Sequence, residues 1–223
     1  MKQFGILFDL DGTLVNSLPD ICGVVNAVRV AFHLPPLEQK VMATFIGRGV
    51  ESLIQDCFPE LSSEQRNGLK AEYAKHYAAS PTHGGALYPG VRKTLEKLRS
   101  YPNVRLGICT NKPTPIAIQT VEHYLPGFKF DYIAGPEAVS KRKPAPEHLT
   151  EVMTKLEVDP ENTWFVGDDM VDFHSAQSAK VTFLAAGYGF GSVKGEPEWT
   201  LTQFYDLLLH VIPVVEPKTA GAK

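Results

Sequence analysis

Residues 4–13 read FGILFDLDGT, an apolar pentapeptide followed at once by two aspartates and a glycine. The apolar run is typical of a strand buried inside a parallel sheet. Gly12 then allows the chain to turn sharply as it leaves that strand. The carboxylates of Asp9 and Asp11 therefore follow the carboxyl end of a strand, which is the edge where open α/β sheets bind their ligands.

Two carboxylates this close repel each other and favour a bound cation or a shared proton. Mg²⁺ is a natural partner, because it prefers oxygen ligands and leaves room for a phosphate. An aspartate in such a site can attack phosphorus while its neighbour transfers protons. Alone, however, Asp11-Gly12 is equally typical of an ordinary turn. The rest of the chain decides between these two interpretations.

The composition excludes several classes of protein. The 223 residues, 43% hydrophobic and 21% charged, predict an ordinary globular protein that needs no disulfides to fold. A net charge of −3 does not favour a nucleic-acid or membrane partner. Cys22, Cys57 and Cys109 lie far apart, which predicts reduced thiols in the core. No secretory signal and no membrane-spanning run is evident, so we expect a cytoplasmic protein.

Residues 15–80 show helical spacing and no convincing strand. Ser17 is the expected cap of the first helix, with Asp20 three residues on, and Ser62 is placed to cap a helix that runs to about Ala79. We expect a helical cap domain at 15–87. The core domain would then comprise residues 1–14 and 88–215, and residues 216–223 would form a flexible tail.

From Tyr88 onward, apolar strand patterns alternate with helical ones. Strands are expected at 104–109, around 132–133, at 164–166 and at 181–185. This alternation predicts an α/β fold, a Rossmann-like parallel sheet core with the α-helical cap inserted into it.

Polar side chains follow three of the predicted strands. Asp9 and Asp11 follow the first, Thr110 and Asn111 follow the strand at 104–109, and Asp168 and Asp169 follow the strand at 164–166. In a parallel sheet these ends share one edge, where hydroxyl and amide groups can bind phosphate oxygens. Thr110-Asn111 alone is also typical of a helix cap, and Asp168-Asp169 alone of a turn. Neither alternative explains the recurrence at three strand ends.

The run Lys141-Arg142-Lys143-Pro144 is the remaining charged motif. Such runs are commonly solvated surface. A lysine brought to this edge of the sheet would instead neutralise an attacking carboxylate and a phosphate together.

These four motifs, taken in order, resemble those of the haloacid dehalogenase (HAD) superfamily phosphatases with a helical cap. The matching residues are Asp9-Leu10-Asp11-Gly12-Thr13, Thr110-Asn111, Lys143-Pro144, and Gly167-Asp168-Asp169 with Asp172. The resemblance covers essentially the whole chain and implies the HAD fold. It also implies an Mg-dependent phosphomonoesterase that forms an aspartyl-phosphate.

The resemblance assigns a role to each motif. Asp9 would be the nucleophile, Asp11 the acid/base, and Asp9, the backbone carbonyl of Asp11, and Asp168 the Mg²⁺ ligands. Lys143 and Thr110 would assist catalysis, and Asp172 would orient the site. The expected substrate-binding residues are Gly12, Thr13, Thr110, Asn111 and Lys143. Asp169 departs from the pattern, since many relatives carry a small hydroxyl residue there, and whether it shares the metal stays open.

Thr110-Asn111-Lys112-Pro113 and Gly47-Arg48-Gly49 most resemble phosphoglycolate phosphatases. Arg48 is a candidate for binding a substrate carboxylate, because guanidinium pairs with carboxylate in a bidentate way. The alternative, a solvated arginine in a turn, fits Arg48 equally well. The same two interpretations, substrate binding and solvated surface, apply to Lys112. The expected partner is a small phosphate ester; the sequence leaves monomer and homodimer open.

Other functions share this chemistry. A sugar-phosphate phosphatase, such as one for N-acetylmuramic acid 6-phosphate, resembles the chain through the same motifs. A phosphomutase or a non-catalytic phospho-ligand-binding protein is a further alternative. Signalling receiver domains use a similar acidic cluster, but they are shorter than this chain and have no helical insertion, so the resemblance to them is weaker. The family's dehalogenases lack the second acid that Asp11 provides, which argues against a dehalogenase.

Overall fold

A six-stranded parallel sheet forms the centre of the computed structural model, which describes residues 2–79, 84–195 and 197–216. Its strands run in the order β5-β4-β1-β6-β7-β8. They are β1 (Phe4–Phe8), β4 (Val104–Cys109), β5 (Tyr132–Ala134), β6 (Thr163–Gly167), β7 (Thr182–Ala186) and β8 (Thr200–Leu201). All five residues of β1 are buried, as its apolar sequence predicts for a central parallel strand. The expected α/β fold is confirmed.

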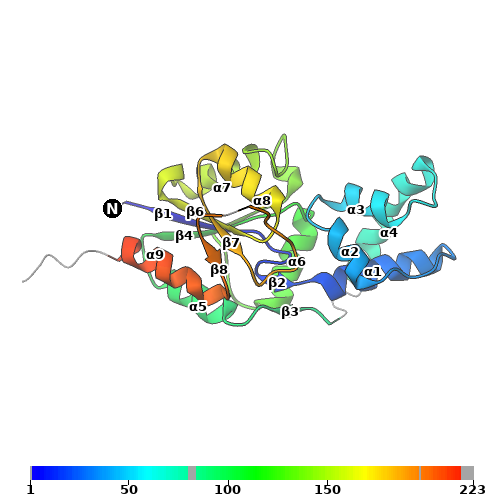
Figure 1. Ribbon diagram of the computed structural model, residues 1–223, viewed down its shortest axis with the longest axis horizontal. Helices are drawn as coiled ribbons and strands as arrows, with labels where there is room; N and C mark the ends of the chain where they lie inside the picture. Colours follow the sequence, from blue (N-terminus) through cyan, green and yellow to red (C-terminus); the bar gives the residue numbers. More distant parts are fainter. Residues whose placement is uncertain (1, 80–83, 196, 217–223) are drawn as a thin grey trace, which may run out of the picture.

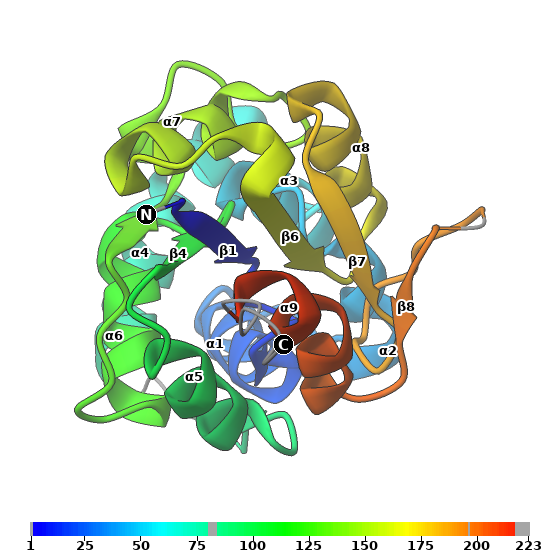
Figure 2. The same cartoon turned by 90° about the vertical axis from the view of Figure 1, so that its left-hand side faces the viewer.

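Helices cover both faces of this sheet, as Figures 1 and 2 show. One face packs on α5 (Val91–Arg99), α6 (Thr114–Tyr124) and α9 (Leu207–Val215), and the other on α7 (Glu147–Leu156) and α8 (Met170–Ala179). Side chains alternate along β1, so Ile6 and Phe8 join the first cluster while Leu7 joins the second. Short 3₁₀ turns lie at Pro136–Ala138 (η2), Pro160–Asn162 (η3) and Phe204–Asp206 (η4).

Four helices gather beyond the carboxyl ends of the strands, to one side of the sheet in Figure 1. They are α1 (Leu18–Ala31), α2 (Gln39–Met42), α3 (Val50–Cys57) and α4 (Ser63–Ala79), with a 3₁₀ turn at Ala43–Phe45 (η1). Their apolar faces form a cluster of their own, which includes Val25, Ile54 and Tyr77 and takes in Ile116 from α6. The four helices thus have a hydrophobic core of their own, distinct from the two clusters that flank the sheet.

The expectation that residues 15–80 contain no strand was wrong at one point. Val15–Asn16 (β2) pairs in antiparallel fashion with Ala86–Leu87 (β3), where the chain enters and leaves the four helices. The two passages lie side by side, and the pairing lets the backbone groups of each passage bond to the other. Strands β2, β3 and β8 escape prediction because two residues carry no periodicity.

The two predicted serine caps differ. Ser62 accepts a hydrogen bond from Gln65 N at 3.2 Å, and Gln65 Oε1 accepts one from Ser62 N at 2.9 Å, which is a capping box. Ser17 precedes α1 but makes no side-chain cap. Its hydroxyl donates instead to Asp11 Oδ1 at 2.5 Å, so the capping prediction for Ser17 was wrong. Asp20 Oδ1 accepts a hydrogen bond from Gly85 N at 2.9 Å.

Cys22, Cys57 and Cys109 are buried free thiols, as the sequence predicts. Within the described ranges, no helix combines the length and apolar character needed to cross a membrane. The predicted flexible tail lies outside the described residues except for Glu216, whose carboxylate accepts a hydrogen bond from Tyr101 Oη at 2.7 Å.

Candidate active site

Three neighbouring strands deliver the polar residues that the sequence singles out. Asp9 follows β1, Thr110 follows β4 and Asp168 follows β6, and β1 pairs with both of the other strands. All three residues are buried. The parallel register therefore converges at one edge of the sheet, as expected for an open α/β fold.

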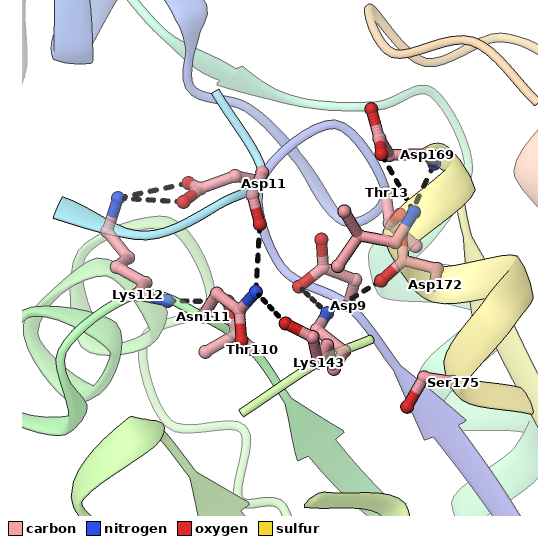
Figure 3. A network of polar contacts seen from close by, with 12 residues as sticks. Asp9, Asp11, Thr13, Thr110, Asn111, Lys112, Lys143, Asp169, Asp172 and Ser175 are labelled. Atoms are coloured by element: carbon pink, nitrogen blue, oxygen red, sulfur yellow. Dashed lines mark hydrogen bonds and ion pairs between the residues drawn. The ribbon is translucent and has the colours of Figure 1, made fainter. Parts of the chain in front are cut away.

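Lys143 lies between two aspartates. Its Nζ is 2.9 Å from Asp9 Oδ1 and donates to Asp172 Oδ1 at 2.7 Å, and all three side chains are buried (Figure 3). Burial opposes the charge on Lys143, but the carboxylates of Asp172 and Asp9 outweigh it and raise the pKa of the lysine. The result is a charged lysine held against both acids.

Asp168 completes this acidic cluster. Its Oδ2 accepts a hydrogen bond from Gly191 N at 2.7 Å, and the Thr13 hydroxyl lies 3.4 Å from its Oδ1. Gly12 has a φ of +86°, and a Cβ there would lie 2.0 Å from the Asp168 carboxylate. Glycine alone combines a readily adopted positive φ with the absence of a Cβ, so Gly12 allows the Asp168 carboxylate to lie against the backbone of this turn.

The donor set fits a divalent cation. Oxygens of Asp9, Asp168 and Asp172 lie within 4.8 Å of one another, and all three residues are buried. Burial, followed by repulsion from Asp172 and Asp9, raises the pKa of Asp168 well above its usual range. Crowded carboxylates of this kind are the oxygen ligands that Mg²⁺ takes, and a bound cation would relieve their repulsion.

Asp169 is occupied in a different way. Its Oδ1 accepts a hydrogen bond from Val171 N at 2.9 Å and caps α8, while its own N–H lies 3.3 Å from Asp172 Oδ2. Asp169 and Asp172 thus form a capping box at the start of this helix. The box fixes the first turn of α8, the turn that carries Asp172 toward Lys143.

A second lysine–aspartate pair lies beside the first. Lys112 Nζ is 3.0 Å from Asp11 Oδ1 and 3.2 Å from Oδ2, and it lies 4.7 Å from the ring centroid of Tyr77 in α4. Figure 3 shows the Asp11 carboxylate directed toward Lys112, away from that of Asp9. Burial opposes the charge of Lys112, but Asp11 outweighs it and raises the pKa of the lysine. Together with the Ser17 hydroxyl, Lys112 engages the Asp11 carboxylate fully.

Asn111 joins the sheet edge to the helical region. Its Nδ2 donates to the carbonyl of Gly47 at 2.9 Å and to that of Lys143 at 3.0 Å. The Thr110 hydroxyl accepts a hydrogen bond from Lys112 N at 3.2 Å. Asn111 therefore positions the loop before Pro144 as well as the turn at Gly47, a role that its predicted contact with phosphate did not include.

A cavity of about 50 Å³ opens between this edge and the four helices. Asp9, Asp11, Thr110, Asn111 and Lys112 line one side. The other lining residues are mostly apolar and come largely from the helical region: Ile21, Ile46, Gly47, Gly49, Val50, Leu53, Tyr73 and Pro113. A smaller cavity, of about 10 Å³, lies on the far side of Asp9 and Asp11, against Asp168 and Asp172.

Arg48 does not line either cavity, although Gly47 and Gly49 on both sides of it do so at the larger one. Its guanidinium pairs with Asp56 Oδ2 at 2.6 Å, and its side chain is 52% exposed. The structure thus places Arg48 on the outer surface of the helical region, apart from the other predicted site residues.

Several contacts at the site carry no signal in the sequence. Ser17 reads as a helix cap, yet it binds Asp11. Gly191 reads as a loop glycine, yet its backbone binds Asp168, and Tyr188 donates to the carbonyl of Thr13 at 3.0 Å. Tyr77 reads as a residue of the helical core, yet its ring faces Lys112. Only the glycine-rich composition around residues 187–191 points to a close backbone approach.

The chain is similar to known proteins over most of its length. The model of the haloacid dehalogenase-like hydrolases matches residues 6–186. The phosphoglycolate phosphatase of Mannheimia succiniciproducens is 34% identical over 93% of this chain and 98% of its own length. That of Salmonella typhi is 31% identical over 92% of this chain and 90% of its own length.

The crystal structure of a predicted phosphoglycolate phosphatase from Haemophilus somnus superposes with a TM-score of 0.86 at 28% identity. It covers 94% of this chain, and 98% of its own chain is covered. Family model, relatives and fold agree with the resemblance that the four motifs indicate: the chain belongs to the haloacid dehalogenase-like hydrolases.

Proposed function

We propose that this protein is an Mg-dependent phosphomonoesterase that hydrolyses 2-phosphoglycolate through an aspartyl-phosphate. The observation that carries the proposal is the buried Lys143 between Asp9 and Asp172, with Asp168 beside them. A lysine in this position holds the Asp9 carboxylate in place and can neutralise a phosphoryl group next to it. The names of the relatives, phosphoglycolate phosphatases over nearly the whole chain, support the substrate.

In the first half-reaction, an oxygen of Asp9 attacks phosphorus and the bond from phosphorus to the ester oxygen breaks. Asp11 gives its proton to that oxygen, so the alcohol leaves neutral. In the second half-reaction, Asp11 takes a proton from a water molecule as the water oxygen attacks phosphorus. The bond from phosphorus to Asp9 then breaks, which releases inorganic phosphate and restores the Asp9 carboxylate.

Asp9, Asp168 and the backbone carbonyl of Asp11 would hold the Mg²⁺. When bound, the ion supplies positive charge beside the phosphate oxygens and among the crowded carboxylates. Asp172 keeps Lys143 directed at Asp9 through its 2.7 Å hydrogen bond. Thr110, at the end of β4, provides a hydroxyl at the same edge.

We also propose that residues 15–87 act as a cap domain on a core of residues 1–14 and 88–215. The strand pair β2–β3 is where the two would hinge, since it is the point of entry and exit. Closure of such a cap excludes bulk water, so that Asp11 controls the proton. The small size of the cavity, about 50 Å³, favours a short leaving group, such as glycolate, over a sugar.

Phosphate release in the presence of Mg²⁺ tests the proposal. The panel comprises 2-phosphoglycolate, N-acetylmuramic acid 6-phosphate, glucose phosphates, pyrophosphate and a nucleotide. We expect the highest kcat/KM for 2-phosphoglycolate and no release by Asp9→Asn, which keeps the shape of the side chain. Preference for a sugar phosphate would support the sugar-phosphate alternative. Absence of Mg-dependent release from every compound would overturn the proposal and favour a mutase or a binding protein.

A further inference from the structure

Lys112 stands out among the residues around the larger cavity. Of the described residues that line it, Lys112 is the only one with a positive charge. Its side chain is 4% exposed, which is unusual for lysine and requires a partner or a ligand. Its backbone N–H donates to the Thr110 hydroxyl at the end of β4, and its Nζ lies 4.7 Å from the ring centroid of Tyr77 in α4.

In this structure Lys112 binds Asp11, the residue that the proposed reaction needs at the ester oxygen of the substrate. Asp11 gives both of its oxygens to Lys112 and also accepts a hydrogen bond from Ser17 at 2.5 Å. Under the proposed function, Asp11 must turn an oxygen to the ester oxygen at phosphorus. Because its carboxylate is directed away from Asp9 here, at least one contact with Lys112 must break first.

The cavity offers one kind of replacement partner for Lys112. The wall that comes from the helical region is mostly aliphatic or aromatic, with Leu53 and Tyr73 among its residues, so a neutral leaving group there would bring the lysine no new acceptor. A leaving group that ends in a carboxylate would provide one. The acceptor must lie close to phosphorus, because Lys112 is two residues from Thr110 and the cavity measures about 50 Å³.

We infer that Lys112 binds the carboxylate of the substrate and that this exchange releases Asp11 to act as the acid. The inference rests on the proposed function and deepens it, since it assigns the substrate class to phosphate esters of short hydroxy acids. Lys112 is then both the residue that determines specificity and the one that couples substrate binding to the position of Asp11. Arg48, the cation that the sequence favoured equally, pairs with Asp56 on the outer surface.

Two esters that differ only in one terminal group separate this role from a general one. 2-Phosphoglycolate and ethyl phosphate share the phosphate and the methylene carbon, and differ by a carboxylate against a methyl group. Comparing each variant with the wild type on the same ester cancels the intrinsic reactivity of that ester. Lys112→Met removes the charge at similar length. Lys75→Met is the matched control, because it removes a lysine that is 76% exposed on α4.

We expect Lys112→Met to lower kcat/KM for 2-phosphoglycolate by about 10- to 150-fold, the range for losing a hydrogen bond to a charged group, chiefly through a higher KM. The kcat/KM for ethyl phosphate should not fall, because this ester offers Lys112 no acceptor and the variant no longer holds Asp11, and Lys75→Met should leave both esters unchanged. Lys112→Arg, which keeps the charge, should retain the preference for the acidic ester. Equal losses on both esters, or no loss on 2-phosphoglycolate, would overturn the inference. So would a selective loss in Arg48→Met without one in Lys112→Met.

A binding measurement separates this inference from the proposed function. Calorimetric titration of 2-phosphoglycolate with Mg²⁺ into Asp9→Asn, with and without Lys112→Met, needs no turnover. We expect the dissociation constant to rise by the same 10- to 150-fold, roughly, when Lys112 is replaced, and that of ethyl phosphate to stay constant. If the wild type releases phosphate from neither ester, the proposed function fails. The titration then still decides whether Lys112 binds the carboxylate, and an unchanged constant would refute it.

Discussion

Two buried lysines each hold one of the two aspartates of the D-x-D motif, but they do so in different surroundings. Lys143 contacts Asp9 and Asp172, both of which belong to elements packed on the sheet. Lys112 contacts Asp11 and faces Tyr77, which belongs to the helical region. Lys143 and its two partners all belong to the proposed core. Lys112 and Asp11 belong to it as well, but Tyr77, which Lys112 faces, belongs to the proposed cap, so a cap motion would change the surroundings of this second pair. The comparison favours a fixed position for Asp9, the proposed nucleophile, and a changeable one for Asp11, the proposed acid.

Replacing Asp11 should have the largest effect. It tests the proposed acid, the aspartate whose position is expected to change. Asp11→Asn can neither give nor take a proton, so we expect kcat to fall by about 10²- to 10⁴-fold. Both formation and breakdown of the phosphoenzyme should slow, which rapid-quench measurement with ³²P-labelled substrate would resolve. If breakdown keeps its wild-type rate, Asp11 serves only the first half-reaction.

Removing Lys143 tests how strongly its ion pairs with Asp9 and Asp172 stabilise the fold. Lys143→Met leaves Asp9 and Asp172 buried without their cation, and we expect a loss of about 3–5 kcal/mol in the free energy of unfolding. Lys112→Met should lose less, about 1–2 kcal/mol, because Asp11 keeps Ser17 and lies nearer to solvent. Urea denaturation of both variants in EDTA gives the comparison. Equal losses would mean that the two pairs are equally fixed.

The surroundings of Lys143 also predict a dependence of stability on pH. Burial and then the charge of Lys143 lower the pKa of His148 from 6.5 to about 4, while its Nε2 lies 3.1 Å from the Ala134 carbonyl. Because the folded-state pKa is the lower one, the contribution is complete above pH 6.5. It decreases as the pH falls toward 4, by about 3 kcal/mol in all.

The His148 variant isolates this effect from the carboxylates that titrate in the same range. His148→Gln keeps a donor for the Ala134 carbonyl but has no charge to gain. Unfolding free energies measured between pH 7 and pH 4 should decrease more steeply for the wild type than for His148→Gln. Parallel curves would show that the imidazole takes up its proton equally in the folded and the unfolded protein, against this account.

The smallest expected effect concerns an ion pair between the loop before Lys143 and the helical region. Arg142, which precedes Lys143, lies 2.6 Å from Glu51 of α3, and both side chains are partly exposed. Arg142→Gln should raise KM for 2-phosphoglycolate by less than about 3-fold, since exposed pairs contribute under about 1 kcal/mol. The difference from the wild type should vanish at about 0.5 M salt. A large effect that persists at high salt would mean that this pair helps to build the site.

The sequence predicted the fold, and the meeting of the candidate site residues at one edge, best where a polar residue follows an apolar run. Asp9, Thr110 and Asp168 are such residues, and a parallel sheet brings the ends of its strands together whatever the loops do. Lys143 was identifiable only through the family pattern, because a basic run alone is typical of the surface.

Side-chain direction was beyond prediction, because it depends on partners distant in the sequence. Ser17 has the sequence of a helix cap, but a stronger acceptor, the Asp11 carboxylate, takes its hydroxyl. Lys112 and Arg48 were indistinguishable as candidates, and tertiary contacts direct one to Asp11 and the other to Asp56. The strands β2 and β3 form because two passages of the chain meet, which no local pattern records.

The position of β1 at the middle of the sheet has a consequence for synthesis on the ribosome. Ile6 pairs with Leu106 on one side and with Trp164 on the other, so the first strand made waits for two much later ones. A nascent chain that has not yet reached β6 carries Asp9, the proposed nucleophile, on a strand with one open edge and lacks Asp168 and Asp172. Such an edge is prone to pairing with other chains. The acidic cluster proposed to hold the metal and the full sheet can therefore form only after more than two thirds of the 223 residues have been made.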